Sequence, residues 1–491
     1  MTKTIHDMPS FELAFRKQFL VSSSFSSTAN EYWTSEPLWR GYRLLRCPSL
    51  HYARHSKGKK DVIVLGVCCD PLQPSQTEAD IVARLVSLPS NFHEFEAAIK
   101  PLAGRWVMLA NFDDDARVYH DACGLKPVFF VDDEEGEPAI ASQPALLEFY
   151  GFTAKQQDLF SRFRAECPGS SSWPVNVIPY HNVRQLLPNH TLVLGSGSTH
   201  RFWPTHPIPR KSTEWATERI IQLLTGSLTS FVERGQCHVG LSGGYDSRLI
   251  CAAASEPLRK ELHFYTVRGA GTKRHDLTIP AAIARSRKLR YDVYDPIQTS
   301  SVVTTQLIRN VGEMFQDPVI SMVPTFGKVI GNGFCIEGMM SETLRCYYWP
   351  DSNGEQADLE PIELTRLAGF GDSEIARCGF ETWRAGVPTN LGVSVLDLLY
   401  WEHRGGVWAS CGWTMKEGLY ESLAPMNNRA LLEAGLTIPQ ELRSKPHQLF
   451  IDLIDCLDPS LLKWPFNTTR VEQICRRYPV PWRVKKWLRT T

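Results

Sequence analysis

The pattern of hydrophobic positions divides the chain into a β-rich first part and a second part in which strands alternate with helices. In the second part, residues 239–241 form a short apolar run typical of a buried strand, and a helix is predicted over residues 213–234 before it. Further strands are predicted at 262–269 and 290–294, on either side of a helix over 276–289. This alternation is typical of a parallel, doubly wound sheet.

The first part shows shorter elements, most of them strands. The predicted strands and one amphipathic helix cover residues 62–67, 104–112, 117–120, 127–131, 139–141 and, for the helix, 81–88. Residues before about 60 give no clear pattern, whereas residues 395–467 are predicted to be mostly helical. The stretch 205–211 is rich in proline and basic residues, as linkers are. The sequence therefore predicts two domains, 1–205 and 212–491.

Composition narrows the function classes. The chain has 491 residues, 43% of them hydrophobic and 22% charged, and its formal net charge is zero. These values predict a globular protein without a nucleic-acid or anionic-membrane partner. The apolar run 62–69 is too short to cross a bilayer, and the polar N-terminus lacks the apolar core of a signal peptide. A cytoplasmic location is expected.

The cysteines argue against a structural metal centre. There are 13 of them, an odd number, and no two are spaced as C-x-x-C. Such scattered cysteines predict free, buried thiols in a reducing compartment rather than a zinc site or a disulfide framework.

The clearest candidate for chemistry is the stretch Ser242-Gly-Gly-Tyr-Asp-Ser247, which directly follows the predicted strand 239–241. A strand, a turn of small residues and the start of a helix together form an anion site, because unpaired helix N–H groups point at the turn. Glycine lets phosphate oxygens approach the backbone. Asp246 adds a carboxylate where a phosphate-bound Mg²⁺ needs a ligand.

The same letters fit more than one function. The stretch resembles the SGGxDS pyrophosphate loop of the ATP pyrophosphatase superfamily, and no kinase-type GxxxxGK[ST] loop occurs in the chain. Residues 240–244 also match G-x-S-x-G, the nucleophile elbow of α/β-hydrolases, with Ser242 as the nucleophile. An ordinary glycine-rich turn is the third alternative.

Segments of the first part resemble the glutaminase-type domain of the asparagine synthetase family. The matching pieces, in the family's order, are Gly104-Arg-Trp106, residues 121–130 (DACGLKPVFF), Ala141-Ser-Gln143, residues 185–192 (QLLPNHTL) and Arg201-Phe-Trp-Pro204. The resemblance implies an N-terminal Ntn-hydrolase-like β-sandwich domain. It also implies a doubly wound, parallel-sheet synthetase domain with a helical C-terminal part.

In one respect the chain departs clearly from the pattern of the asparagine synthetase family. The family's glutaminases use a cysteine at position 2 as nucleophile, whereas this chain has Thr2, and the family's glutamine-binding signatures are missing. β-Lactam synthetases and lasso-peptide cyclases have lost this cysteine in the same way. Glutamine is therefore not expected to supply nitrogen.

The family's second signature, V-x-x-G-x-G-x-D-E, corresponds to residues 334–344 (FCIEGMMSETL). Aligned on Gly338 without a gap, Glu342 takes the place of the metal-binding aspartate. With a one-residue gap, Ser341 takes that place instead. Either alignment implies an altered Mg²⁺ site.

The resemblance assigns functional residues as follows. ATP and pyrophosphate would be bound by Gly240, Leu241, Ser242, Gly243, Gly244, Tyr245, Asp246, Ser247, Val267 and Gly338. Asp246 and Glu342 would hold Mg²⁺. Arg404 and Lys445, with Glu342, would be catalytic, and Arg443 or His447 could take the role of Lys445.

These assignments predict an ATP-dependent ligase that adenylates a carboxylate, releases pyrophosphate and passes the acyl group to an amine or ammonia. Its substrates would be small-molecule or peptide carboxylates and amines, and a homodimer is the assembly considered. The alternatives are a glutamine-hydrolysing asparagine synthetase, a nucleotide-binding module without ligase activity, and a serine hydrolase.

Overall fold

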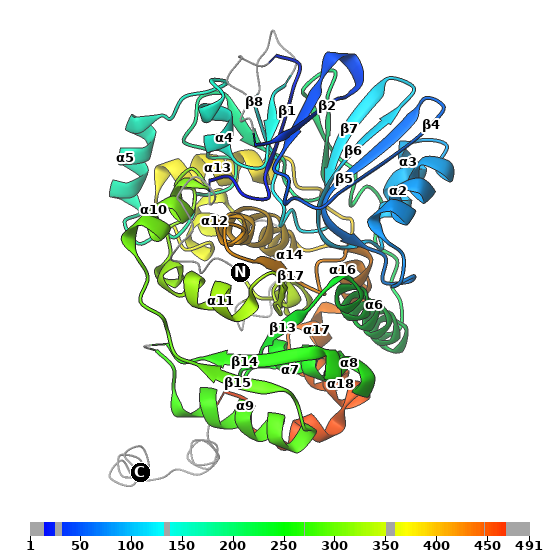
Figure 1. The fold of residues 1–491 in the computed structure, drawn as a ribbon, viewed down its shortest axis with the longest axis vertical. Helices are drawn as coiled ribbons and strands as arrows, with labels where there is room; N and C mark the ends of the chain where they lie inside the picture. Colours follow the sequence, from blue (N-terminus) through cyan, green and yellow to red (C-terminus); the bar gives the residue numbers. More distant parts are fainter. Residues whose placement is uncertain are drawn as a thin grey trace.

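The computed structural model describes residues 14–24, 32–131, 138–269, 271–349, 359–445 and 447–467. Two antiparallel sheets lie at one end of the molecule and a parallel sheet lies at the other, with helices between them (Figure 1). The predicted fold class is confirmed at the level of the sheets, because two antiparallel sheets are followed along the chain by a parallel, doubly wound one.

The antiparallel sheets have six strands each. The first has the order β10-β8-β9-β1-β3-β2 and consists of β1 (Phe19–Ser22), β2 (Thr34–Pro37), β3 (Arg43–Arg46), β8 (Phe129–Val131), β9 (Ile140–Ala141) and β10 (Val183–Gln185). The second has the order β12-β11-β7-β6-β5-β4 and consists of β4 (Tyr52–Lys57), β5 (Lys60–Cys69), β6 (Ala103–Phe112), β7 (Asp115–His120), β11 (His190–Val193) and β12 (Thr199–Arg201). Strands β1 to β4 lie before residue 60, in the region where no clear pattern of hydrophobic positions was found.

Alternation along β5 explains how the second sheet is packed on both faces. Ile63 and Leu65 belong to the core shared with the first sheet, which makes the pair a sandwich. Val62 and Val64 point the other way and contact a cluster covered by helices α2 (Glu78–Ser87) and α3 (Phe92–Ile99).

The parallel sheet has the order β15-β14-β13-β16-β17. Its strands are β13 (Cys237–Gly240), β14 (Leu262–Val267), β15 (Tyr291–Tyr294), β16 (Phe334–Ile336) and β17 (Glu421–Leu423). The chain starts at β13, moves outward to β14 and β15, and then returns to β16 on the other side. The carboxyl ends of β13 and β16 therefore form the switch point at which such sheets bind ligands.

Strand β17 corrects the prediction that residues 395–467 are helical. It is a three-residue strand that pairs in parallel with β16. A strand this short has no periodicity of its own, and its conformation is fixed by the neighbouring strand.

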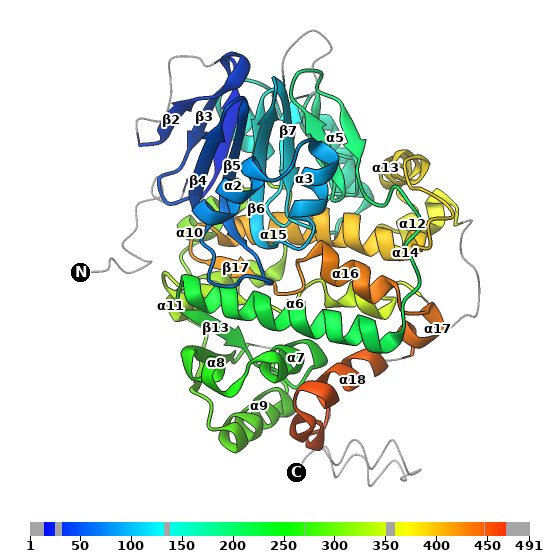
Figure 2. The same ribbon diagram turned by 90° about the vertical axis from the view of Figure 1, so that its right-hand side faces the viewer.

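Helices fill the middle of the molecule and surround the parallel sheet. They are α4 (Pro144–Phe149), α5 (Gln157–Glu166), α6 (Thr213–Arg234), α7 (Tyr245–Ala253), α8 (Glu256–Glu261), α9 (Arg274–Arg287), α10 (Ser301–Arg309), α11 (Val323–Ile330), α12 (Pro361–Leu367), α13 (Glu374–Ala385), α14 (Val395–Leu398), α15 (Ser410–Lys416), α16 (Arg429–Leu436), α17 (Gln440–Arg443) and α18 (Gln448–Leu457). A π-helical stretch, Leu399–Ala409, joins α14 to α15, and a 3-10 turn, η4, covers Ser341–Arg345. Figure 2 shows α6 running between the antiparallel sheets and the parallel sheet.

Buried polar contacts join the first part of the chain to the second. Arg105 donates to Glu417 (2.6 Å), and both side chains are almost fully buried. Arg201 donates to the buried Glu402 (2.6 Å) in the π-helical stretch. These contacts make the antiparallel part a packed neighbour of the parallel part.

Two further expectations can be compared with the described residues. No disulfide links any of the 12 described cysteines, and most of them are buried, as predicted. None of the described helices is long and apolar enough to span a membrane.

Candidate nucleotide site

The glycine-rich loop lies at the switch point of the parallel sheet. Strand β13 ends at Gly240, and helix α7 begins at Tyr245, within the predicted loop of residues 242–247. Gly244 is the N-cap, in an extended conformation, and no side chain caps the first turn. The N–H groups of this turn are therefore left for an anion, and the helix dipole favours negative charge there.

Serine hydroxyls fix the shape of the loop from inside. The Ser242 and Ser247 hydroxyls are 2.9 Å apart, and the backbone N–H of Gly244 donates to Ser242 Oγ (3.1 Å). The backbone N–H of Ser242 donates to Ser247 Oγ (3.1 Å). The two serines thus hold the turn closed around Gly243 and leave the N-terminal end of α7 facing outward.

The second signature lies directly against the loop. A Cβ atom placed on Gly338 would be 2.6 Å from Asp246 Cβ, so only glycine allows this approach. Ser341 Oγ donates to Asp246 Oδ1 (2.6 Å) and lies 3.5 Å from Glu342 Oε2. Both residues that the two alignments offered, Ser341 and Glu342, are therefore next to Asp246.

Glu342 is held in a mostly buried position by two partners. Tyr400 donates its hydroxyl hydrogen to Glu342 Oε2 (2.8 Å), and Arg345 donates to Oε1 (3.2 Å). Burial raises the pKa of Glu342, and the nearby charge of Asp246 raises it further. Two carboxylates that repel each other in this way would be stabilised by a shared cation.

The residues fit the ligand set expected for Mg²⁺ with ATP. Among the described residues, no group of three or more His, Cys, Asp or Glu side chains could hold a metal ion by itself. Mg²⁺ in nucleotide sites usually takes one or two carboxylates and completes its shell with phosphates and water. Asp246 and Glu342 match that pattern.

Two residues of this site were missed by the sequence analysis. Arg345 lies three residues after Glu342 in η4, and its guanidinium is also 3.4 Å from His447 Nδ1. Tyr400 lies in the π-helical stretch, 58 positions after Glu342 in the chain. A basic residue directly after the second signature was a visible signal for Arg345, whereas nothing in the sequence pairs Tyr400 with Glu342.

Neither of the two predicted catalytic cations, Arg404 and Lys445, makes a described contact with the loop. The guanidinium of Arg404 stacks on the Trp408 ring (3.7 Å), and none of its described contacts involves residues 240–247. Lys445 is exposed, and its side chain makes no hydrogen bond or ion pair with the described residues. It lies two residues before His447, whose ring stacks on Tyr245 of the loop (4.0 Å).

The two substitutes considered for Lys445 differ sharply. Arg443 is buried and donates to Asp397 (2.7 Å), so its charge is already paired. His447 contacts the loop through Tyr245, and its pKa is lowered by burial and by Arg345. Of the two, only His447 lies at the loop.

The end of β14 contributes the neighbouring edge of the site. Leu241 donates its N–H to the carbonyl of Tyr265 (2.8 Å), and Thr266 Oγ1 donates to the carbonyl of Leu241 (2.7 Å). Val267, which is the last residue of β14, therefore lies at the same end of the sheet as the loop.

The last described residues of the chain pack on the loop. Phe466 stacks on Tyr245 (3.9 Å) and under the guanidinium of Arg248 (3.7 Å). Arg248 also donates to the carbonyls of Trp464 (2.7 Å) and Pro465 (2.8 Å). The N–H of Asn467 donates to the carbonyl of Gly243 (3.0 Å). Residues 464–467, here called the C-terminal strap, thus cover one side of the loop.

The hydrolase alternative finds little support in this geometry. The described hydrogen bonds of Ser242 Oγ are to Ser247 and Gly244, and no described histidine contacts it. A serine nucleophile needs a general base within hydrogen-bond reach.

Comparisons with known proteins add no family assignment. No protein-family model matches the chain, and no curated protein matches it. One similar solved structure is glutamine phosphoribosylpyrophosphate amidotransferase from B. subtilis complexed with ADP and GMP. It has a TM-score of 0.25 and 10% identity, and the match covers 74% of this chain and 75% of that one. Another, titled the allosteric regulatory enzyme of purine biosynthesis, has a TM-score of 0.24 and 9% identity, over 67% and 70% of the two chains. At such scores neither carries an argument about this chain, and its fold class rests on the order of its own strands.

Proposed function

We propose that this protein is an ATP-dependent ligase that forms amide bonds by adenylating a carboxylate and transferring the acyl group to an amine. One observation carries the proposal. Gly338 and Ser341 of the second signature lie against Asp246 of the first, at the switch point of the sheet and beside an uncapped helix start. Because β13 and β16 pair in parallel, the two motifs that follow these strands meet at one edge of the sheet, where a single ligand could contact both.

The residues would divide the work by charge. The first-turn N–H groups of α7 and the backbone of Gly243 would bind the β- and γ-phosphates. Asp246 and Glu342 would hold Mg²⁺, which when bound neutralises phosphate charge. Arg345 would add a cation on the side of Glu342, and Val267 would border the base of the nucleotide. The enzyme's contribution is positioning and charge stabilisation.

In the proposed reaction a carboxylate oxygen attacks the α-phosphorus of ATP, and the bond to the bridging oxygen of pyrophosphate breaks. An amine nitrogen then attacks the acyl carbon, AMP leaves with the electron pair of the broken bond, and the nitrogen loses a proton. Asparagine synthetase activity with ammonia is one form of this reaction.

A second candidate, a nucleotide-binding module without ligase activity, is favoured by one feature. Ser341 donates to an oxygen of Asp246 (2.6 Å). In the alignment with a gap, Ser341 stands at the position where the signature of the asparagine synthetase family has the metal-binding aspartate. In this reading the loop binds nucleotide and the altered metal site prevents turnover.

Product analysis separates these functions. The protein is incubated with ATP, Mg²⁺ and a panel of amino acids and small carboxylates, and the nucleotides are resolved by chromatography. We expect AMP and pyrophosphate, with turnover reduced at least about 100-fold in Asp246→Asn because the metal carboxylate is lost. Asp372→Asn is the matched control, because Asp372 is exposed and pairs only with Arg366 among the described residues.

Each contrary result has a distinct meaning. ADP and phosphate as products would contradict the ligase. ATP binding measured by equilibrium dialysis without turnover of any carboxylate would favour the second candidate. Normal turnover by Asp246→Asn, with an unchanged melting temperature, would remove Asp246 from the metal site.

A further inference from the structure

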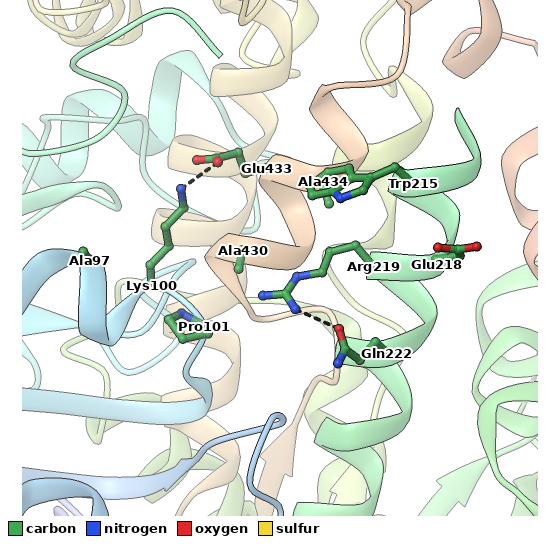
Figure 3. Close-up of a pocket in the computed structure, with 10 residues that line it drawn as sticks. All are labelled: Ala97, Lys100, Pro101, Trp215, Glu218, Arg219, Gln222, Ala430, Glu433 and Ala434. Carbon is green, nitrogen blue, oxygen red and sulfur yellow. Dashed lines mark hydrogen bonds and ion pairs between the residues drawn. The ribbon is translucent and has the colours of Figure 1, made fainter. Parts of the chain in front are cut away.

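A large cavity lies away from the loop, between the first and second parts of the chain. It has a volume of about 680 Å³, and its lining comes from the end of α3, from α6 and from α16 (Figure 3). This volume is within the range of about 300–1,000 Å³ that is usual for small-molecule sites. None of its lining residues belongs to the loop or to residues 334–345. It is therefore separate from the candidate nucleotide site.

The floor of the cavity is made of small residues. Ala97 of α3 and Ala430 and Ala434 of α16 line it, and Pro101 completes one side. Alanines at positions four apart on α16 present one flat helix face. Such a floor leaves space for a flat apolar group.

One wall carries an indole ring that is open to the cavity. Trp215 lies in the first turn of α6, and 42% of it is exposed, although tryptophan is usually well buried. Its Nε1 makes no hydrogen bond with the described residues, and Lys211 lies over its ring at 5.6 Å. An exposed ring beside an apolar floor can stack with a planar ligand.

The charges around the cavity favour an anion. Arg219 donates to the neutral side chain of Gln222 (2.8 Å), and among the described residues no carboxylate pairs with it. The acid on the opposite wall, Glu433, is already satisfied by Lys100 (2.6 Å) and by Trp203 Nε1 (2.7 Å). Glu218 also lines the cavity, but in Figure 3 its side chain extends from α6 on the other side from that of Arg219. Of the two cations that line the cavity, Lys100 is paired with Glu433, whereas Arg219 has no carboxylate partner among the described residues.

We propose that this cavity binds a planar aromatic anion, such as an aryl carboxylate or an aryl phosphate. The ring would lie between Trp215 and the alanine floor, and the anionic group would pair with Arg219. A planar guanidinium matches a carboxylate or phosphate through two parallel hydrogen bonds, which fixes the orientation of the ligand.

The test uses 2-naphthoate as the probe, and its neutral amide, 2-naphthamide, as the matched control. Binding to the full chain is measured by isothermal titration calorimetry. We expect saturable binding of the acid, and weaker binding of the amide by about tenfold or more, because the charged hydrogen bonds are lost. Arg219→Gln should weaken binding of the acid by a similar factor, whereas Glu218→Gln should leave it within about twofold.

A second pair of variants tests the apolar part. Trp215→Ala should weaken binding of both compounds, and Ala430→Leu should block it by filling the floor, with folding checked by circular dichroism. If either of these fails to fold, Arg219→Gln decides, because Arg219 is on the partly exposed side of α6. The proposal is overturned if the wild type shows no saturable binding of 2-naphthoate, if the amide binds as tightly, or if Arg219→Gln has no effect.

Discussion

Arg345 and Arg404 show how differently two arginines can be used near the same site. Arg345 contacts Glu342 and His447, both of which face the loop residues, and its side chain is 22% exposed. Arg404 stacks on Trp408 within the π-helical stretch. The sequence resemblance favoured Arg404, but the contacts favour Arg345 as the cation that meets the phosphates.

Replacing each arginine by glutamine tests this difference. We expect Arg345→Gln to raise the KM for ATP by about tenfold or more, since a charged hydrogen bond contributes about 1.5–3 kcal/mol. Arg404→Gln should change the KM by no more than about twofold, and the two variants are compared in the same pyrophosphate-release assay. The reverse ranking would restore Arg404 as the phosphate ligand.

A buried histidine sets a pH dependence of stability. The ring of His403 packs edge-on against Phe370 and Phe380, and burial, together with the smaller effect of the Arg404 charge, lowers its pKa to about 3. In the unfolded chain the pKa is about 6.5. Between these values the unfolded state binds one more proton, so the free energy of unfolding falls as the pH falls from 6.5 toward 3.

For His403 alone, lowering the pH from 7 to 5 should cost about 2 kcal/mol of unfolding free energy. His403→Phe keeps an aromatic ring but cannot titrate. Between pH 7 and pH 5, its free energy of unfolding should therefore fall by about 2 kcal/mol less than that of the wild type. Urea unfolding at pH 7 and pH 5 measures both proteins. Equal losses in the two proteins would show that His403 is not the group responsible.

At the level of single residues, the sequence located the loop but not all of its surroundings. Residues 242–247 are consecutive in the sequence, and a tight turn that lets an anion approach the backbone requires small residues at these positions. Gly338 and Glu342 could be placed because they belong to a second local pattern. Tyr400 could not, because its contact with Glu342 depends on how the π-helical stretch packs across η4.

At the level of elements, the long helix α6 was predicted with its exact bounds, 213–234, and the short elements were not. Ser212 caps α6 through a bond from the N–H of Trp215 (3.2 Å), and Gly235 ends it. By contrast, the short strand β17 was not predicted, because its conformation is fixed by pairing with β16. Helix α7 gains its first turn because Gly244 can serve as N-cap and Asp246 complements the helix dipole.

The C-terminal strap is the element with the most direct bearing on the loop. Its Asn467 donates to the carbonyl of Gly243, and its side-chain oxygen would lie 3.5 Å from a Cβ atom on Gly244. Phosphates that approach the loop from this side would have to displace Asn467. The stack of Phe466 on Tyr245 stabilises the covered state.

We therefore expect Phe466→Ala to lower the KM for ATP by about twofold to tenfold, because an aromatic pair contributes about 0.5–1.5 kcal/mol and the covered state would be less populated. Phe466→Tyr keeps the stack and is the matched control. Both are compared with the wild type by initial-rate measurements over a range of ATP concentrations. A higher KM in Phe466→Ala would mean that the strap is part of the binding site rather than a cover.

At the level of the whole molecule, the segments that resemble a glutaminase domain contact the second part of the chain. Asn427 donates to the carbonyl of Gly104 (2.6 Å) and to Asp121 (2.8 Å), and it accepts from the N–H of Cys123 (2.9 Å). Lys126 donates to Glu417 (2.7 Å). Because these groups are buried and bonded to one another, loss of one partner would leave others without a hydrogen bond.

This arrangement gives the first part a structural role that does not depend on glutaminase chemistry. The two domains predicted from the linker at 205–211 share one hydrophobic cluster, which includes Leu20 and Val67 of the sandwich and Val239 of β13. A linker pattern reports only the local chain and says nothing of the area buried around it. The extent of this contact could therefore not be predicted from the sequence.

The nitrogen of the proposed amide bond is not expected to come from glutamine. Thr2, the residue in the place of the glutaminase cysteine, lies outside the described residues, and the sequence has none of the glutamine-binding signatures of the family. The segments that resemble the glutaminase domain act in packing, as the contact of Gly104 with Asn427 and that of Lys126 with Glu417 illustrate. We expect no glutamate release from glutamine, with or without ATP, and we expect Thr2→Ala to behave like the wild type. Ammonia or an amine on the substrate would then supply the nitrogen, which added ammonia should reveal as increased AMP formation. Glutamate release that disappears in Thr2→Ala would contradict this and make the first part a working glutaminase with a threonine nucleophile.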